Sequence, residues 1–198
     1  MNEDPAFDGL PQARPRKLFI AIVVMAFLFY IPLVLTAYVF QDESRKQLAA
    51  EGMALLNTQD YTGAVAVWQR LLAQHPDAVE AFLGLGIAYT QMGDFERADD
   101  AFVRGLELYS GDNRLVFNRA LSFMSRGDRA KARELLLDLR GRDALYPETH
   151  YHLGRMAEAE GDFKTARDLY VQELNVNAAC AKAWYRLDLL QAGGQCPR

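Results

Sequence analysis

The sequence predicts an all-α protein, a solenoid of stacked helix pairs preceded by one membrane-spanning helix. Three observations point to this fold class. An uncharged apolar run covers residues 18–40, a 34-residue period repeats through most of the rest of the chain, and glycine followed by aspartate returns at 34-residue steps, from Gly93 to Gly127 and Gly161. With 51% apolar and 24% charged residues, the 198-residue chain has the composition of a folded protein rather than a disordered one.

Two segments precede the period. Residues 1–17 are rich in proline, show no apolar periodicity and are expected to form a disordered tail. Residues 18–40 are expected to form a transmembrane helix, because the bilayer core needs about 20 apolar residues in helical form. A cleaved signal peptide, the alternative, has an apolar region of only about 7–15 residues, and "LTA" at 35–37 is a poor cleavage site. Pro32 removes one backbone hydrogen bond from this helix, which a local kink or a neighbouring helix must absorb.

Basic residues flank the apolar segment unequally. Three lie just before it, at Arg14, Arg16 and Lys17, and two follow it, at Arg45 and Lys46. The excess of positive charge on the N-terminal side predicts a cytoplasmic N-terminus in a single-pass cell-membrane protein. The repeat region is then extracytoplasmic, which for a bacterial inner-membrane protein means the periplasm. The two cysteines near the C-terminus agree with this placement, because disulfides persist in oxidising compartments.

The period is carried by columns of similar residues that lie 34 positions apart. The clearest columns hold alanine, aspartate and a large apolar residue: Ala64, Ala98, Ala132 and Ala166; Asp60, Asp94, Asp128 and Asp162; Trp68, Phe102, Leu136 and Tyr170. Apolar residues at helical spacing in 80–94 and 95–108 predict two helices in each unit. Gly93 is expected to end the first helix, and Asp94 to cap the second. Because one such pair cannot bury its own apolar face, the pairs must stack.

This pattern resembles the tetratricopeptide repeat (TPR), whose units share columns of Leu-Gly, Tyr, Ala, an aromatic residue and Pro. The best-matching unit carries Phe82, Leu85, Gly86, Tyr89, Ala98 and Phe102. Gly86 and Ala98 are expected to be small because the two helices approach closely there. The resemblance implies a TPR solenoid with four repeats, a capping helix and a C-terminal tail, at 45–78, 79–112, 113–146, 147–180, 181–191 and 192–198.

Some positions depart from the repeat pattern. Glu51 and Arg119 stand in the leucine column of the first and third repeats, and Ala120 replaces the glycine that follows. Arg119 is expected to pair with a neighbouring acidic residue, or alternatively to contact a partner. His150 and His152 are two residues apart and point to different faces of a helix, which argues against a metal site. His150 lies in a packing column, so we expect it to be buried.

The two ends of the repeat region carry further predictions. No glycine or proline separates Phe40 from the first repeat, so the membrane helix is expected to run into that repeat with little break. At the other end, Cys180 and Cys196 flank the capping helix, which is about 16 Å long. The intervening "AGGQC" is long enough to fold back, so a disulfide is feasible. Free thiols or a bond to a partner are the alternatives.

The resemblance also implies a binding surface. In TPR proteins the first helix of each pair lines the concave side, through the second, fifth, ninth and twelfth positions of each repeat. The groove residues expected on this basis are Met53, Leu56, Leu83, Ile87, Thr90, Phe117, Leu121, Met124, Tyr151, Arg155, Tyr185 and Leu189. Exposed apolar surfaces usually mark partner sites, so we expect the groove to bind an apolar helix or extended segment. The alternative is that tighter coiling buries some of these side chains in the core.

The sequence argues against several other function classes. The net charge of −4 and the lack of a Lys/Arg-rich run argue against nucleic acid. Neither cysteine lies in a Cys-x-x-Cys pair, so the usual signatures of zinc, redox and c-type haem sites are missing. With no nucleophile–base set or phosphate loop, we expect no enzyme, no catalytic residue, no metal, no cofactor and no small-molecule substrate. Ala49 and Met53 replace the Lys and Asn with which some TPR proteins clamp a C-terminal carboxylate.

We therefore interpret the chain as a membrane-anchored TPR protein that acts as a scaffold or adaptor in a membrane complex. Its expected partners are the lipid bilayer, through residues 18–40, and a protein that is either a subunit of that complex or a client polypeptide. Two alternatives remain open. The layout is similar to that of membrane-anchored TPR proteins of bacterial cytochrome c maturation and nitrite-reductase assembly, which implies an assembly chaperone that holds an apocytochrome. A structural scaffold would instead use the groove for self-association.

Overall fold

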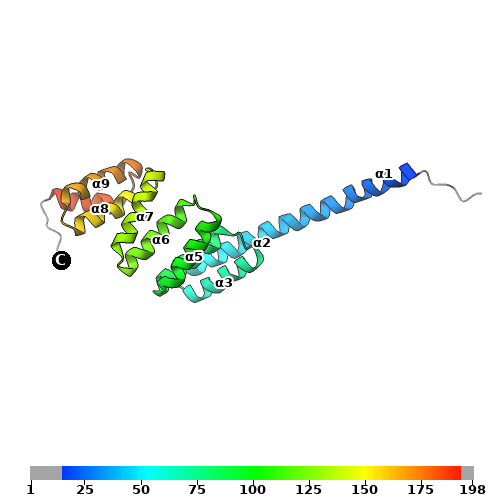
Figure 1. Cartoon of the computed structure of the whole chain (residues 1–198), viewed down its shortest axis with the longest axis horizontal. Helices are drawn as coiled ribbons and strands as arrows, with labels where there is room; N and C mark the ends of the chain where they lie inside the picture. Colours follow the sequence, from blue (N-terminus) through cyan, green and yellow to red (C-terminus); the bar gives the residue numbers. More distant parts are fainter. Residues whose placement is uncertain (1–14, 193–198) are drawn as a thin grey trace, which may run out of the picture. The chain divides into compact units, whose positions relative to one another are not determined.

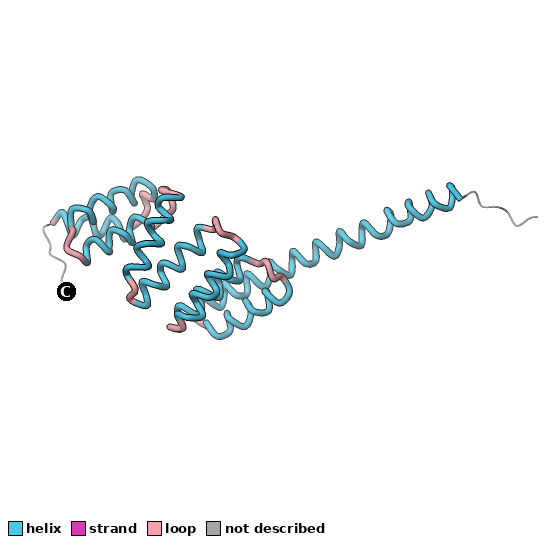
Figure 2. The backbone as a smooth tube through the Cα atoms, in the orientation of Figure 1, coloured by secondary structure: helices cyan, strands magenta, loops and turns pink. Residues whose placement is uncertain are grey.

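The computed structural model describes residues 15–192 (Figure 1). The chain divides into two compact units, residues 1–47 and 48–198. Every regular element between residues 15 and 192 is helical, and no strand occurs in this part of the chain (Figure 2). The predictions made for residues 1–14 and 193–198, including the disulfide partner Cys196, lie outside the described residues.

The first unit is an apolar helix with one irregular turn. The helix α1 (Pro15–Met25) leads into a π-helical turn, η1 (Ala26–Tyr30), which is followed by α2 (Ile31–Asn57). The π turn ends two residues before Pro32, which cannot donate a hydrogen bond to the carbonyl of Leu28 four residues earlier. Widening the turn also relieves the clash between the proline ring and that carbonyl. The distortion expected at Pro32 therefore takes the form of a π turn.

This N-terminal helix is the one stretch of the described residues that is long and apolar enough to cross a membrane. Its large side chains are exposed; Phe27 and Leu33, for example, are each 65% exposed. A signal sequence near the N-terminus can also form an apolar helix of this kind, and differs from a membrane span in the shorter length of its apolar core. The helical assignment runs without interruption from Ile31 to Asn57, as the lack of glycine and proline after Phe40 predicted.

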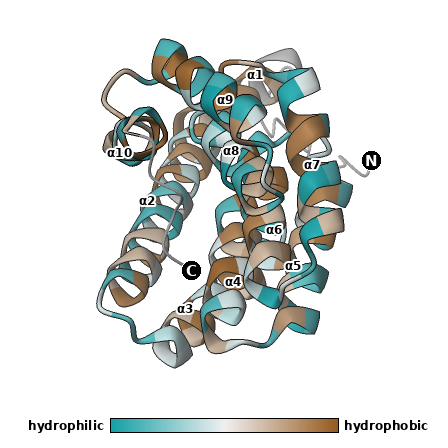
Figure 3. Ribbon diagram, turned by 90° about the vertical axis from the view of Figure 1, so that its left-hand side faces the viewer, coloured by the Kyte–Doolittle hydropathy of each residue, from teal (hydrophilic) through white to brown (hydrophobic). Residues whose placement is uncertain are grey.

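The second unit is a stack of helical hairpins. The last turns of α2 pair with α3 (Tyr61–Gln74), and the pairs that follow are α4 (Val79–Met92) with α5 (Phe95–Leu108), α6 (Asn113–Arg126) with α7 (Arg129–Arg142), and α8 (Thr149–Ala159) with α9 (Phe163–Val176), before the final α10 (Ala181–Gln191). The second helices of the hairpins begin 34 residues apart. Each hairpin contacts the next, and α4 also contacts α6 directly. Figure 3 shows that helices such as α5 carry one hydrophobic and one hydrophilic face, as stacking requires.

The turn inside each hairpin has a repeated geometry. An aspartate carboxylate caps the second helix by accepting a hydrogen bond of 2.9–3.3 Å from the backbone N–H three residues later, at Asp60, Asp94, Asp128 and Asp162. The residue before the aspartate has a positive φ, which is 77° at Gly93 and 63° at Gln59. Glycine reaches this conformation at little cost, whereas glutamine rarely adopts it. The stop predicted at Gly93 and the cap predicted at Asp94 are confirmed.

In each hairpin, a large side chain on the second helix packs against a small residue on the first helix. A Cβ built on Gly86 would lie 2.4 Å from the ring of Phe102, which is closer than atoms can approach. The third hairpin lacks this glycine, and there Leu136 replaces the ring. The matched pairs are Gly52 with Trp68, Gly86 with Phe102, Ala120 with Leu136, and Gly154 with Tyr170. The close approach predicted at Gly86 is confirmed.

The core forms two clusters that divide within α6. One collects buried residues from Leu48 to Leu115, and the other from Ala120 to Leu187. Among the described residues, the buried polar and charged side chains all lie on the C-terminal side of this division: Ser122, Thr149, His150, Glu158 and Glu173. His150 is 5% exposed, in agreement with its place in a packing column.

Both charged residues in the leucine column form ion pairs. Arg119 Nε lies 2.6 Å from Asp99 Oδ1, and Arg70 Nη2 lies 2.6 Å from Glu51 Oε2. The Arg119 guanidinium also lies over the ring of Phe123, 5.6 Å from its centroid. The ion pair predicted for Arg119 is therefore confirmed. The charged side chains of Glu51 and Arg119 reach solvent, whereas Leu85 in the same column is buried.

Glu173 on α9 caps the start of α8 from outside that helix. Its carboxylate is fully buried and accepts hydrogen bonds from the backbone N–H groups of Glu148, at 2.8 Å, and Tyr151, at 3.4 Å. Glu148 has a φ of 63°, and its own side chain does not cap the helix. The buried negative charge is stabilised because it meets the free N–H groups and the positive end of the α8 dipole.

Glu158 on α8 forms a second buried polar contact. Its carboxylate accepts a 2.6 Å hydrogen bond from the Tyr170 hydroxyl and lies 3.2 Å from Arg186 Nε on α10. Burial, followed by the hydrogen bond to Glu158, raises the pKa of Tyr170 well above its ordinary value. These contacts tie α8 to both α9 and α10.

Candidate partner-binding groove

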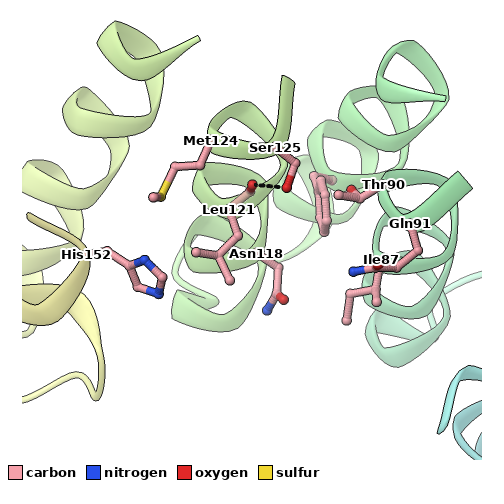
Figure 4. A pocket seen from close by; sticks show the side chains of 9 residues that line it. Ile87, Thr90, Gln91, Asn118, Leu121, Met124, Ser125 and His152 are labelled. Carbon is pink, nitrogen blue, oxygen red and sulfur yellow. Dashed lines mark hydrogen bonds between the residues drawn. The ribbon is translucent and has the colours of Figure 1, made fainter. Parts of the chain in front are cut away.

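Two adjoining pockets lie along the first helices of the repeats. The α4–α6 pocket, of about 270 Å³, is lined by Ile87, Thr90, Gln91, Phe102, Asn118, Leu121, Met124, Ser125 and His152 (Figure 4). The basic pocket, of about 360 Å³, is lined by Met124, Arg129, Tyr151, His152, Arg155, Met156, Ala159 and Lys182. The pockets share Met124 and His152, so a single ligand can reach both.

Helical spacing brings the lining residues of the α4–α6 pocket together. On α4, Gln91 follows Ile87 by four residues, and on α6, Ser125 follows Leu121 by four, so each pair shares one face of its helix. Figure 4 shows Leu121 between Ile87 of α4 and His152 of α8. Three successive first helices therefore contribute side chains to one surface.

A hydroxyl pair fixes α4 against α6 beneath this pocket. Thr90 Oγ1 lies 2.7 Å from the carbonyl oxygen of Gly86 and 2.9 Å from Ser122 Oγ. Because Thr90 has one hydroxyl proton and donates it to Gly86, the Ser122 hydroxyl donates to Thr90. This contact satisfies the buried Ser122 side chain and holds the two helices that form the pocket walls.

Aromatic side chains surround His152, which lines both pockets. The ring centroids of Phe117 and Tyr146 are 5.3 Å apart, those of Phe117 and His152 are 5.7 Å apart, and those of Tyr151 and His152 are 5.2 Å apart. Tilted and edge-on contacts at these distances are favourable for aromatic rings. They hold the His152 ring of α8 against Phe117 of α6.

The surroundings of His152 keep its imidazole neutral. Burial lowers the pKa of His152 to about 4, and the positive charges of Lys182 and Arg155 act in the same direction. The Glu148 carboxylate, 3.6 Å from His152 Nε2, opposes them but does not outweigh them. At neutral pH, His152 is therefore an uncharged wall of both pockets.

Three cations from three helices surround the basic pocket. Arg129 begins α7, Arg155 lies in the middle of α8, and Lys182 lies in the first turn of α10. Arg155 Nη1 donates to the Tyr151 hydroxyl at 3.3 Å. Lys182 Nζ lies 3.4 Å from a carboxylate oxygen of Glu148 and 5.9 Å from the centroid of the Tyr151 ring. The pocket thus offers positive charge and hydrogen-bond donors beside an apolar wall.

The structure places the predicted groove residues in three groups. The α4–α6 pocket takes Ile87, Thr90, Leu121 and Met124, the basic pocket takes Met124, Tyr151 and Arg155, and Met53, Leu56, Leu83, Phe117, Tyr185 and Leu189 line neither. Leu56, Leu83 and Phe117 are partly buried against the core clusters. Met53 and Tyr185 are 48% and 64% exposed. Some of the predicted surface is therefore core, and partner binding at the remaining positions stays a prediction.

Several lining residues were not among the predicted positions: Gln91, Asn118, Ser125 and His152 in the α4–α6 pocket, and Arg129 and Lys182 in the basic pocket. Lys182 stands at the second position of the final helix, so the register rule itself marks it. Glu158 stands at the twelfth position of its repeat, yet its side chain points into the core rather than the groove. The position in the repeat alone therefore does not predict whether a side chain lines the groove or is buried in the core.

The cysteine and histidine positions give no metal centre in the described part of the chain. Within residues 15–192, no group of three or more His, Cys, Asp or Glu side chains is placed to hold a metal ion. Cys180 is 5% exposed and is the N-cap residue of α10. The disulfide proposed for it stays a prediction, because Cys196 lies outside the described residues.

Stacked helix pairs with a groove along their first helices define a helical-repeat binding protein. The sequence profile described as tetratricopeptide repeat matches residues 49–113 and 117–183, which is more than half of the chain. The chain therefore belongs to the tetratricopeptide repeat family. TPR proteins generally act as scaffolds for protein–protein interaction, and the fold is typically non-enzymatic.

Solved structures share this fold. TTC0263, a TPR protein from Thermus thermophilus, has a TM-score of 0.68 and 18% identity over 91% of this chain and 100% of that one. The protein pilF from Pseudomonas aeruginosa has a TM-score of 0.65 and 19% identity over 79% of each chain. MamA from Desulfovibrio magneticus has a TM-score of 0.58 and 20% identity over 86% of this chain and 99% of that one. At these identities the likeness concerns the fold alone. No curated protein matches the chain.

Proposed function

We propose that this protein is a membrane-anchored adaptor that binds an apolar segment of a partner protein in the groove of α4, α6 and α8. The α4–α6 pocket is the observation that carries the proposal. Ile87, Leu121 and Met124 come from two successive repeats and present apolar surface to solvent at one place. An apolar side chain that enters this pocket buries its surface and theirs together, which supplies the main driving force for association.

The N-terminal helix supports the second half of the proposal. Its apolar run is longer than the about 7–15 residues of a signal-peptide core and matches the about 20 needed to span a bilayer. A retained span keeps the repeats at the membrane surface, where a subunit of a membrane complex is within reach. The basic residues before the run favour a cytoplasmic N-terminus and extracytoplasmic repeats.

Substitution in the pocket tests the binding role. Leu121→Asp places a charge in the apolar wall, while Leu145→Asp is the matched control because Leu145 is 72% exposed and lies outside both pockets. The full chain is expressed in its native membranes, crosslinked and purified, and its partners are identified by mass spectrometry. We expect Leu121→Asp to lose the partner that wild type and Leu145→Asp retain, with unchanged helicity by circular dichroism. Equal capture by all three proteins would contradict the proposal.

The identity of the captured protein separates the alternatives for the site. A subunit of a membrane complex supports the adaptor, a haem-free cytochrome supports an assembly chaperone, and a second copy of this chain supports self-association. None of the contacts in residues 15–192 favours the last two.

The anchor is tested separately. Alkaline extraction of membranes should leave the full-length chain in the pellet, and intact-mass measurement should find residues 18–40 still attached. Release of a shorter chain that lacks this segment would show a signal sequence instead. A protease added to spheroplasts should cut the repeat region if it is extracytoplasmic.

A further inference from the structure

The basic pocket has a charge that its own chain leaves largely unbalanced. Arg129, Arg155 and Lys182 line it, and no Asp or Glu is among its lining residues. Within the described residues, nine other arginines lie within 4.0 Å of a carboxylate, whereas neither Arg129 nor Arg155 does. Two arginines without a carboxylate partner thus lie beside one pocket, in a protein of net charge −4.

The third cation is only weakly neutralised. Lys182 lies 3.4 Å from Glu148, but the two side chains are 61% and 35% exposed. Exposed pairs of this kind contribute little, because water screens both charges. Lys182 is therefore free to turn towards a ligand without a large loss.

The same positive charge affects His152, which lines both pockets. Burial is the main reason why the pKa of His152 is low, and Lys182 and Arg155 lower it further. Met124 and His152 also line the α4–α6 pocket, so positive charge lies directly beside an apolar cavity. A ligand that fills both pockets needs an apolar group and an anionic group close together.

We infer that the basic pocket binds an acidic side chain, Asp or Glu, of the same partner segment whose apolar side chain fills the α4–α6 pocket. This inference rests on the proposed function and names the partner chemistry that the groove selects. Bidentate contacts from Arg129 and Arg155 suit a carboxylate, and Lys182 adds a further donor.

The acid belongs to a side chain within the segment rather than to its C-terminus. The face of α10 that carries Lys182 continues to Tyr185, three residues later, which is 64% exposed. Groove surface therefore extends beyond the basic pocket, and a bound chain continues past it instead of ending there.

Peptide selection tests the inference on the full chain in detergent micelles. A displayed library of random twelve-residue peptides is selected for binding, and selected sequences are resynthesised with amidated C-termini. We expect an apolar residue with a nearby Asp or Glu, and about tenfold weaker binding when that acid becomes Asn or Gln. The acid preference should disappear in Arg129→Gln/Arg155→Gln and persist in the control Arg104→Gln, which lies on α5 outside both pockets. Bound acidic peptide should also raise the pKa of His152, measured by NMR.

The outcomes separate this inference from the proposed function. Acidic and amide peptides that bind equally, yet lose binding in Leu121→Asp, would overturn the inference and leave the adaptor proposal standing. Binding that requires a free terminal carboxylate would overturn the internal acid. If no peptide is selected by wild type, both proposals fail.

Discussion

The two halves of the repeat stack are built from the same hairpin but are held together differently. From Leu48 to Leu115 the described core contains apolar side chains only, whereas beyond Ala120 it also contains the five buried polar or charged ones. In the first half, rings packed on glycines join the hairpins. In the second half, carboxylates and a neutral histidine are added to this packing. One repeat pattern thus tolerates two kinds of interior. The α4–α6 pocket takes lining residues from both halves, and the basic pocket lies within the second half.

Trp68 illustrates how aromatic packing joins the hairpins of the first half. Its ring lies between Gly52 of its own hairpin and Gly84 of the next, where added Cβ atoms would come within 2.5 and 2.2 Å. In the second half, Glu173 stands in the column that holds Leu71 and Leu139 elsewhere. The ring joins hairpins by shape, and the carboxylate joins helices by hydrogen bonds.

Removal of Trp68 should have the largest effect on stability. Trp68→Ala leaves a cavity between two hairpins, and we expect it to lower the free energy of unfolding by about 3–5 kcal/mol. Trp184→Ala is the matched control, because Trp184 is 56% exposed and should cost much less. Urea unfolding followed by circular dichroism measures both. Similar losses of unfolding free energy for the two variants would show that the Trp68 ring contributes no more to stability than an exposed tryptophan.

Glu173→Gln should have the next largest effect. The amide keeps the size of the side chain but turns a donor towards backbone N–H groups that need an acceptor, which should cost about 2–3 kcal/mol. Hydrogen exchange should show early opening of α8, while α4 in the first half stays protected. The exposed Glu107→Gln should change stability by less than about 0.5 kcal/mol. Unchanged protection of α8 would contradict the capping role of Glu173.

Acid should weaken the second half before the first. The pKa of His152 is lowered from 6.5 to about 4 on folding, so the unfolded chain takes up the proton first as the pH falls. This contribution is complete above pH 6.5, is lost between pH 6.5 and about 4, and is constant below that; we expect a loss of about 2 kcal/mol, allowing for residual solvent exposure. His152→Phe should reduce this pH dependence and leave the part that comes from His150, whose pKa burial also lowers, whereas His75→Phe in the first half should keep all of it. A pH profile that is the same in both variants would exclude His152 as its source.

The packing of Phe102 against Gly86 predicts a smaller effect on stability, which should be non-additive when both residues are changed. Gly86→Ala should cost about 1–2 kcal/mol, because the new Cβ meets the Phe102 ring. Gly86→Ala combined with Phe102→Leu should recover part of this loss, since the third hairpin already combines Ala120 with Leu136. Strict additivity in a double-mutant cycle would show that the two positions are not coupled.

Much of the architecture could be predicted because the 34-residue period reflects contacts within and between neighbouring helices. The Gly93–Asp94 turn, the close contact at Gly86 and the ion pair of Arg119 follow from residues that act on near neighbours. The buried carboxylates do not follow in this way. The role of Glu173 in an apolar column can be recognised only when the free N–H groups of α8 are seen to face it. The burial of Glu158 likewise depends on its contacts with Tyr170 and with α10.

The groove was predictable only in part for a related reason. Register identifies which positions of a first helix face inward, but the curvature of the stack decides which of them remain exposed. Leu83 packs against the core, while Ile87, four residues later, lines a pocket. Arg129 was not predictable from the groove register at all, because it belongs to a second helix and reaches the basic pocket from the turn.

A photocrosslinking amino acid in native membranes shows whether the first helices present the binding surface. It is placed at Leu121 in the α4–α6 pocket and, in a second protein, at Leu137, which is 41% exposed on α7 outside both pockets. We expect a discrete partner adduct from position 121 and none from position 137. An adduct from position 137 alone, or none from either position, would contradict this expectation.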